Sequence, residues 1–227
     1  MTPHFQFLLF IATLGFGISS LVETTSWTLR AMSNKSNHGF FNAKANIYLY
    51  GGRFFTLLFM MILSFIVDKE TDLHHVLKFI TISVSFAAFI QLLYWNSAFF
   101  FRAVNRVIIF LLLSKVAAVN SLTMPNRIYR HLLLKSWMAT SILVFGVTSP
   151  YILASIYPDI KMTISTVGQA INAIGTVILL FNVEPLLYRR MDKNDLHIHV
   201  FSYIKGRCLG FILAASIFWI LLLIIPK

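Results

Sequence analysis

This sequence has few charged residues and especially few acidic ones. Of its 227 residues, 12% are charged and 58% are hydrophobic, whereas a soluble globular protein is roughly a quarter charged and about half apolar. So little charge cannot cover a soluble surface, and no long polar segment is left over to form a soluble domain. The composition therefore predicts a single polytopic membrane domain over residues 1–227.

The chain also lacks the motifs of several enzyme classes. The lone cysteine, Cys208, excludes an internal disulfide and a cysteine-based metal cluster. There is no P-loop, no GxSxG and no HExxH motif, which argues against an ATPase and against the familiar hydrolases. The histidines at 74–75 and 197–199 have no supporting carboxylate motif. We therefore expect no catalytic residues, no metal and no cofactor.

The charge that is present is mostly basic, with 19 Lys and Arg against 8 Asp and Glu. In a membrane protein such an excess first reflects orientation and contact with anionic lipid head groups. No basic, aromatic-interleaved nucleic-acid motif accompanies it. The expected partners are therefore membrane lipids and not nucleic acid.

Apolar runs close to the roughly 20 residues that cross a bilayer recur along the chain. They predict an all-α bundle of six transmembrane helices. Pro158 lies in the expected turn between the fourth and fifth spans, while Pro185 and Pro226 mark the expected ends of the fifth and sixth. The spans are expected at roughly 5–29, 45–67, 76–101, 132–157, 163–184 and 203–225.

The segment 103–122 contains too few consecutive apolar residues to form a seventh span. Its apolar core covers only 107–113, so an amphipathic helix in the membrane interface fits better, with a re-entrant segment as the open alternative. Six spans place most of the 19 Lys and Arg residues on the side of loops one, three and five. The positive-inside rule then makes that side cytoplasmic and puts both termini outside.

Two charged residues are expected inside neighbouring spans at the same depth. Glu23 precedes Arg30 by seven residues, and Arg53 follows Asn46 by seven, which is roughly 10 Å in each helix. We therefore expect Glu23 and Arg53 to pair. The pair either fixes helix packing alone or lines a cavity, and charges buried in membranes are functional candidates by default.

A second polar group is expected at the fifth and sixth spans. The spacing i, i+4, i+7, i+11 gives one polar stripe, which either bonds neighbouring helices or lines the same cavity; its members are Ser165, Gln169, Asn172 and Thr176. Farther along, Glu184 is expected to pair with Arg207. The glycines at 51 and 52 are expected to allow close helix approach or local backbone distortion.

An arginine fork binds phosphate or carboxylate through two parallel hydrogen bonds and keeps its proton. A cavity with several arginines near its cytoplasmic mouth suits an anionic, phosphate-bearing substrate. The candidate substrate-binding residues are Glu23, Arg30, Asn46, Arg53, Gln169, Asn172, Glu184 and Arg207.

Three pieces of the chain together resemble the Amj family of bacterial lipid II flippases. They are VETTSWTLR at 22–30, NIYLYGGRFF at 46–55, and the late run at 172–193 followed by GRCLG at 206–210. The resemblance covers both ends of the chain, while the middle, about 70–160, matches by hydropathy alone. Glu stands at two places where the family more often has Asp.

The resemblance implies translocation of an undecaprenyl-pyrophosphate-linked peptidoglycan precursor, lipid II, to the outer leaflet of the bacterial cytoplasmic membrane. Such a protein is a transporter for cell wall biogenesis and not an enzyme. The residues alone leave three alternatives open. They are a flippase for another anionic lipid-linked glycan, a membrane-embedded lipid-phosphate enzyme, and an assembly subunit whose polar residues only join helices.

Overall fold

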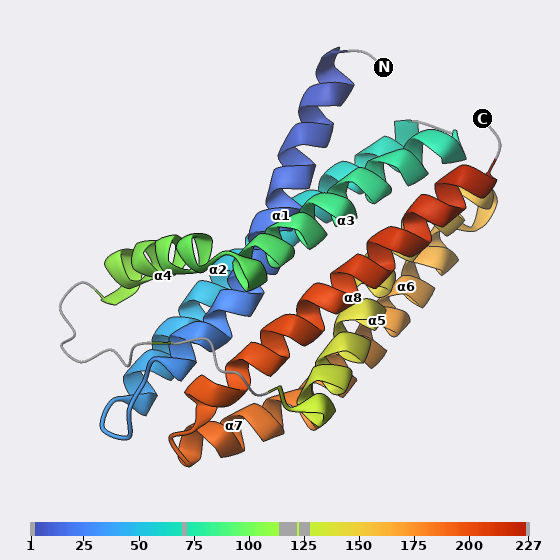
Figure 1. Ribbon diagram of the computed structural model, residues 1–227. Coiled ribbons are helices and arrows are strands. Elements are labelled where there is room, and N and C mark those ends of the chain that lie inside the picture. The colour runs from blue at the N-terminus through green and yellow to red at the C-terminus, as the bar shows by residue number, and fades with distance from the viewer. Residues whose placement is uncertain (1–2, 70–71, 114–121, 123–127, 226–227) are drawn as a thin grey trace.

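The computed structural model describes residues 3–69, 72–113, 122 and 128–225, and throughout these ranges the chain is helical apart from short turns (Figure 1). Six helices are long and apolar enough to cross a membrane, so the prediction of an all-α, multi-pass membrane protein is confirmed. They are α1 (Pro3–Ala31), α2 (His38–Lys69), α3 (Leu73–Asn96), α5 (Arg130–Ile156), the rod of α6 (Lys161–Ile178), η2 (Leu179–Val183) and α7 (Glu184–Asp192), and α8 (Leu196–Ile224).

The helices form two groups of three that meet along α8. Helices α1, α2 and α3 pack together, α5 packs between α6 and α8, and α3 lies against α8. Two ends of the bundle can be named by residues. The Arg30 end carries the turns from α1 to α2 and from α7 to α8, and the Asp68 end carries both chain termini (Figure 1).

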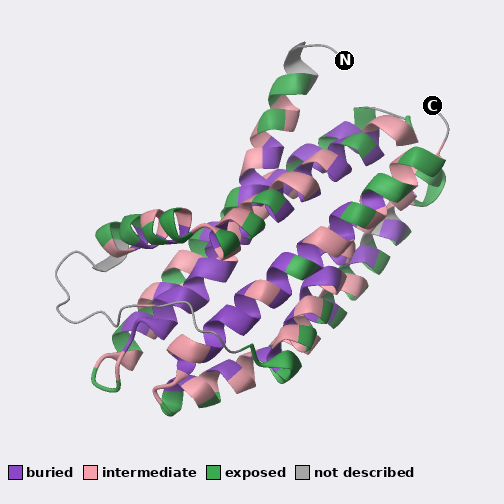
Figure 2. Ribbon diagram, viewed as in Figure 1, coloured by how far each residue is buried: buried purple, intermediate pink, exposed green. Residues whose placement is uncertain are grey.

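The two ends of the bundle have different cores. Toward the Asp68 end the core is built from aliphatic side chains and phenylalanines such as Phe16, Phe59, Phe79 and Phe211. Toward the Arg30 end the core contains amphipathic aromatics, Trp27, Tyr94 and Tyr203. Burial is highest along α1, α3 and α8 and lowest on α4 and α6 (Figure 2).

Glycines allow the closest helix approaches. A Cβ atom at Gly210 of α8 would lie 2.8 Å from the Cβ of Thr140 on α5, and one at Gly206 would lie 2.5 Å from the Leu133 carbonyl oxygen. This is the small-xxx-small arrangement that lets membrane helices pack backbone to backbone. A Cβ atom added at Gly52 would collide with the Val22 side chain, whereas one added at Gly51 would meet no atom of another segment within 4 Å. The expected close approach is therefore confirmed for Gly52 and wrong for Gly51, and α2 runs through both without distortion.

Helix α4 (Ala98–Leu113) is separate from the six spans and projects to one side near the Arg30 end (Figure 1). It begins five residues before the predicted 103–122 helix, and 114–121 lie outside the described residues. Phe99 and Phe110 on its exposed face are each 78% exposed. Buried Asn105 anchors the other face by accepting a hydrogen bond from the Tyr94 hydroxyl. This two-faced helix agrees with the interfacial interpretation.

Four predicted boundaries differ from the structure by five residues or more. The second and sixth spans begin seven residues earlier than predicted, at His38 and Leu196. The third span ends at Asn96, because residues from Ala98 onward belong to α4.

Pro185 does not end the fifth span, since the rod remains helical to Asp192. Proline lacks the N–H that an α-helix would use at this position. Here a π-helical turn precedes it, and Pro185 stands in the first turn of α7, where proline is tolerated.

Candidate functional site

The polar site begins on α1 with an ion pair between Glu23 and Arg207 of α8. The Arg207 Nη2 atom donates to the Glu23 carboxylate at 2.5 Å. The guanidinium is 2% exposed, while the Glu23 side chain is 36% exposed. The Arg207 side chain is thus shielded from the surroundings of the bundle, whereas the Glu23 carboxylate is partly accessible.

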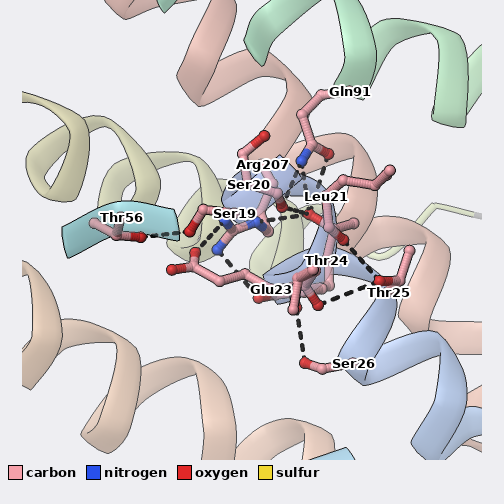
Figure 3. A network of polar contacts seen from close by, with 12 residues as sticks. Ser19, Ser20, Leu21, Glu23, Thr24, Thr25, Ser26, Thr56, Gln91 and Arg207 are labelled. Carbon is pink, nitrogen blue, oxygen red and sulfur yellow. Dashed lines mark hydrogen bonds and ion pairs between the residues drawn. The ribbon is translucent and has the colours of Figure 1, made fainter. Parts of the chain in front are cut away.

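Arg207 is also held by neutral groups. Its Nε atom donates to the Thr24 hydroxyl at 3.0 Å, and its Nη1 atom donates to the Tyr203 hydroxyl at 3.3 Å. The buried amide of Gln91 on α3 contacts Thr24 and donates to the Ser20 carbonyl at 2.8 Å (Figure 3). The network joins α1, α3 and α8. The Nε, Nη1 and Nη2 atoms of Arg207 each donate to an oxygen atom.

The predicted pair of Glu23 with Arg53 is therefore wrong, although the two residues do lie at the same level. Gly52 packs against Val22, and Thr56 bonds to Ser19 across the same seam (Figure 3). Arg53 is thus level with Glu23. However, neighbouring residues of a helix point about 100° apart, so Arg53 points away from the α1–α2 contact made by Gly52.

The predicted pair of Glu184 with Arg207 is also wrong, because Arg207 forms its ion pair with Glu23. Glu184 instead lies within electrostatic range of Arg30 and Arg53. It stands directly after the π-helical turn, and π-helical turns within membrane and soluble helices often occur at functional sites. The half-buried carboxylate therefore lies near two arginines of the other helix group.

Arg30 is buried and fully engaged in joining α1 to α2. Its Nη2 atom donates to the Asn46 side-chain oxygen at 2.6 Å, and its Nε atom donates to Asn42 at 2.9 Å. The guanidinium also stacks on Trp27, 4.5 Å from the ring centroid. Arg30 and Asn46 are thus brought together as the sequence suggested, and they form part of the wall of the site.

Arg53 differs from the other two arginines because it is exposed. The structure gives it a ring contact with Tyr50 at 5.2 Å and an electrostatic interaction with Glu184. Among the described residues it forms no salt bridge within 4.0 Å. Its guanidinium therefore has hydrogen-bonding capacity to spare.

The remaining candidates, Gln169 and Asn172, lie nearer the Asp68 end. Both line a pocket of about 150 Å³ between α2, α5 and α6. Thr176 of the predicted stripe does not line the pocket, and its hydroxyl donates to the Asn172 carbonyl of its own helix at 2.9 Å. The side chain of Ser165 lies outside the described residues. The stripe is thus split between a pocket and a local helix contact.

Gln91, Thr24 and Tyr203 complete the environment of Arg207. Sequence reasoning missed Gln91 and Tyr203, and it quoted Thr24 only within VETTSWTLR, without making it a candidate site residue. Uncharged polar residues are common in membrane helices, so nothing in their types or spacing marked them. The only available signal was that a buried arginine needs several oxygen partners.

No family model, no curated protein and no solved structure matches this chain.

Proposed function

We propose that this protein translocates a polyprenyl-pyrophosphate-linked precursor, such as lipid II, across the bacterial cytoplasmic membrane for cell wall synthesis. It acts as a transporter and not as an enzyme. The observation that carries the proposal is Arg53, an exposed guanidinium within a membrane-spanning helix that lacks a salt bridge among the described residues.

Counting charges at the site supports an anionic ligand. Glu23 and Arg207 neutralise each other. The remaining cluster holds two cations, Arg30 and Arg53, and one carboxylate, Glu184. A charge inside a membrane span costs at least about 2.5 kcal/mol unless it is compensated. A phosphate oxygen pair fits the free arginine fork and removes the excess positive charge.

Exposure of Arg53 also supports a lipid as the bearer of that anion. The neighbouring exposed residues on α2 include Phe54 at 65% and Leu57 at 58% exposure. These apolar side chains face the surroundings of the bundle, where a membrane would place acyl chains. A lipid whose anionic group binds Arg53 can therefore keep its prenyl chain outside the protein.

The positive-inside rule gives the direction of transport. Arg30, Lys44 and Arg189 all belong to the Arg30 end, which is then cytoplasmic, and both termini are periplasmic. Arg53 follows Asn46, the partner of Arg30, by seven residues, so it lies roughly 10 Å from the level of Arg30 along α2. The site thus receives lipid from the cytoplasmic leaflet, where such precursors are assembled.

The membrane potential can drive the outward movement of an anionic substrate. The sequence has no nucleotide-binding motif. A membrane that is negative inside favours outward movement of an anion by about 2.3 kcal/mol per charge per 100 mV. Transport should therefore slow when the potential is collapsed.

The test is the appearance of lipid II in the outer leaflet of cells in which this protein is the only lipid II flippase. Arg53→Ala is expected to lower the rate at least tenfold. Arg102→Ala is the matched control, because exposed Arg102 lies on α4, outside the six spans, and among the described residues its side chain donates a hydrogen bond to the Ala98 carbonyl of its own helix alone. Unchanged transport by Arg53→Ala, or chemical turnover of a lipid pyrophosphate by the purified protein, would contradict the proposal.

A further inference from the structure

The pocket between α2, α5 and α6 is distinct from the arginine cluster and is built for a neutral ligand group. Its polar walls come from Ser64 on α2 and from Gln169 and Asn172 on α6. Amide and hydroxyl groups both donate and accept hydrogen bonds. Such walls suit a group rich in hydroxyl or acetamido functions.

The two charged residues of the pocket neutralise each other. Lys161 Nζ lies 3.3 Å from the Asp68 carboxylate and donates to the Val67 carbonyl at 3.3 Å. These contacts tie the beginning of α6 to the end of α2 and limit the pocket at its Asp68 end. A second tie, from the Tyr151 hydroxyl to the Met60 carbonyl at 3.3 Å, joins α5 to α2. The pocket therefore offers no free charge to an ion.

The pocket is also open to the side of the bundle. Ser64 and Gln169 are exposed although they belong to membrane-spanning helices. Polar side chains at such positions usually face a partner group or a water-filled cavity. Because they border the pocket from opposite walls, a ligand can enter between α2 and α6 without leaving the membrane.

The pocket and Arg53 share one face of α2. Met60 lies seven residues beyond Arg53 and Ser64 lies eleven beyond it, and both spacings return to nearly the same side of a helix. The rise of 1.5 Å per residue puts the pocket roughly 10 to 16 Å from Arg53 along the helix. A sugar attached directly to a pyrophosphate bound at Arg53 extends along this face of α2 toward the nearer side of the pocket, at Met60.

The size of the pocket fits one ring. Its volume is about 150 Å³, which is the size at which an engineered cavity takes up a benzene molecule. A single pyranose ring fills such a space, and its substituents extend through the open side. A second sugar or a peptide lies outside the pocket.

We propose that the α2–α5–α6 pocket binds the first sugar of the lipid-linked substrate, while Arg53 binds the adjoining pyrophosphate. This assignment rests on the proposed function and adds a recognition site for the neutral part of the ligand. Gln169 and Asn172 supply hydrogen bonds from α6, and Ser64 supplies them from α2. The pocket thus makes the protein prefer a glycosylated lipid over the bare polyprenyl pyrophosphate.

The test compares two probes on the purified full-length protein by native mass spectrometry. One is undecaprenyl pyrophosphate, and the other is the same lipid carrying a single N-acetylhexosamine. The unmodified protein is expected to bind the glycosylated probe at least tenfold more tightly. Gln169→Leu and Ser64→Leu are expected to reduce that ratio to about one, with the affinity for the bare lipid unchanged.

Gln6→Leu is the matched control, since Gln6 is an exposed amide on α1 that does not line the pocket. A preference for the sugar that survives both pocket variants overturns this inference but leaves the proposed function standing, provided that Arg53→Ala weakens both probes. If Arg53→Ala weakens neither probe, the proposed function and the sugar site both fail. Equal binding of the two probes to the unmodified protein also overturns the sugar site.

Discussion

Arg207 and Arg53 lie at similar depth in the same bundle, yet their surroundings are opposite. Arg207 is 2% exposed and has partners in Glu23, Thr24 and Tyr203. Arg53 is exposed and contacts the ring of Tyr50. Burial with a complete set of partners marks the first as part of the framework, and exposure with spare hydrogen bonds marks the second as a ligand-binding group.

This difference shows why charge inside a membrane span does not by itself identify a binding site. A buried ion pair is strongly destabilised when one partner is lost, yet the pair itself contributes little net stability. A binding residue should show the reverse pattern, with little effect on stability and a large effect on affinity. The variants below separate the two patterns.

The largest change in stability is expected from Glu23→Leu. This variant leaves the buried Arg207 guanidinium without a counter-charge, which typically costs 3–5 kcal/mol, or about 3 kcal/mol here because the Glu23 side chain is partly exposed. Denaturant unfolding in detergent micelles measures the change. Arg53→Ala is the control and should shift stability by less than about 0.5 kcal/mol. Equal losses of stability in both variants would contradict the assignment of Arg207 to the framework and of Arg53 to ligand binding.

The next largest effect is expected at the α1–α2 seam that orients Arg53. Gly52→Ala places a methyl group into Val22, and such overpacking costs about 1–3 kcal/mol. Its neighbour provides the control, because Gly51 has open space around it and Gly51→Ala removes a helix-weakening glycine, worth up to about 1 kcal/mol in stability. Thermal unfolding of the two variants should move in opposite directions. Destabilisation by both would show that the seam is arranged differently.

The smallest change in stability is expected when both members of the ion pair are replaced. Glu23→Leu combined with Arg207→Met removes both charges together, and such exchanges are often neutral or stabilising. The double variant should recover most of the stability lost in Glu23→Leu and should keep transport, because Arg53 remains. Recovered folding with lost transport would assign the ion pair to substrate binding as well.

The common level of Glu23 and Arg53 was predictable from the sequence, but the direction in which each side chain points was not. The rise of a helix is fixed, so counting residues placed Glu23 and Arg53 correctly at one level. The side from which α8 approaches α1 depends on the packing of the whole bundle. Arg207, which is 184 residues away from Glu23 in the chain, therefore took the place expected for Arg53.

The course of the fifth span was mispredicted for a local reason. Pro185 normally suggests a helix end, and the compensating π-helical turn at Leu179–Val183 has no simple sequence signature. The glycines of GRCLG, which were quoted only for the family resemblance, lie at a close contact between α8 and α5. Small residues are informative because their role depends on size alone.

The central claim is that Arg53 is kept free for a pyrophosphate. The most direct measurement is the affinity of the purified protein for undecaprenyl pyrophosphate, compared between the unmodified chain, Arg53→Ala and the control Arg102→Ala. We expect Arg53→Ala to lose at least tenfold in affinity, about 1.4 kcal/mol, at unchanged stability, while Arg102→Ala binds normally. Equal affinity of all three proteins would contradict the account.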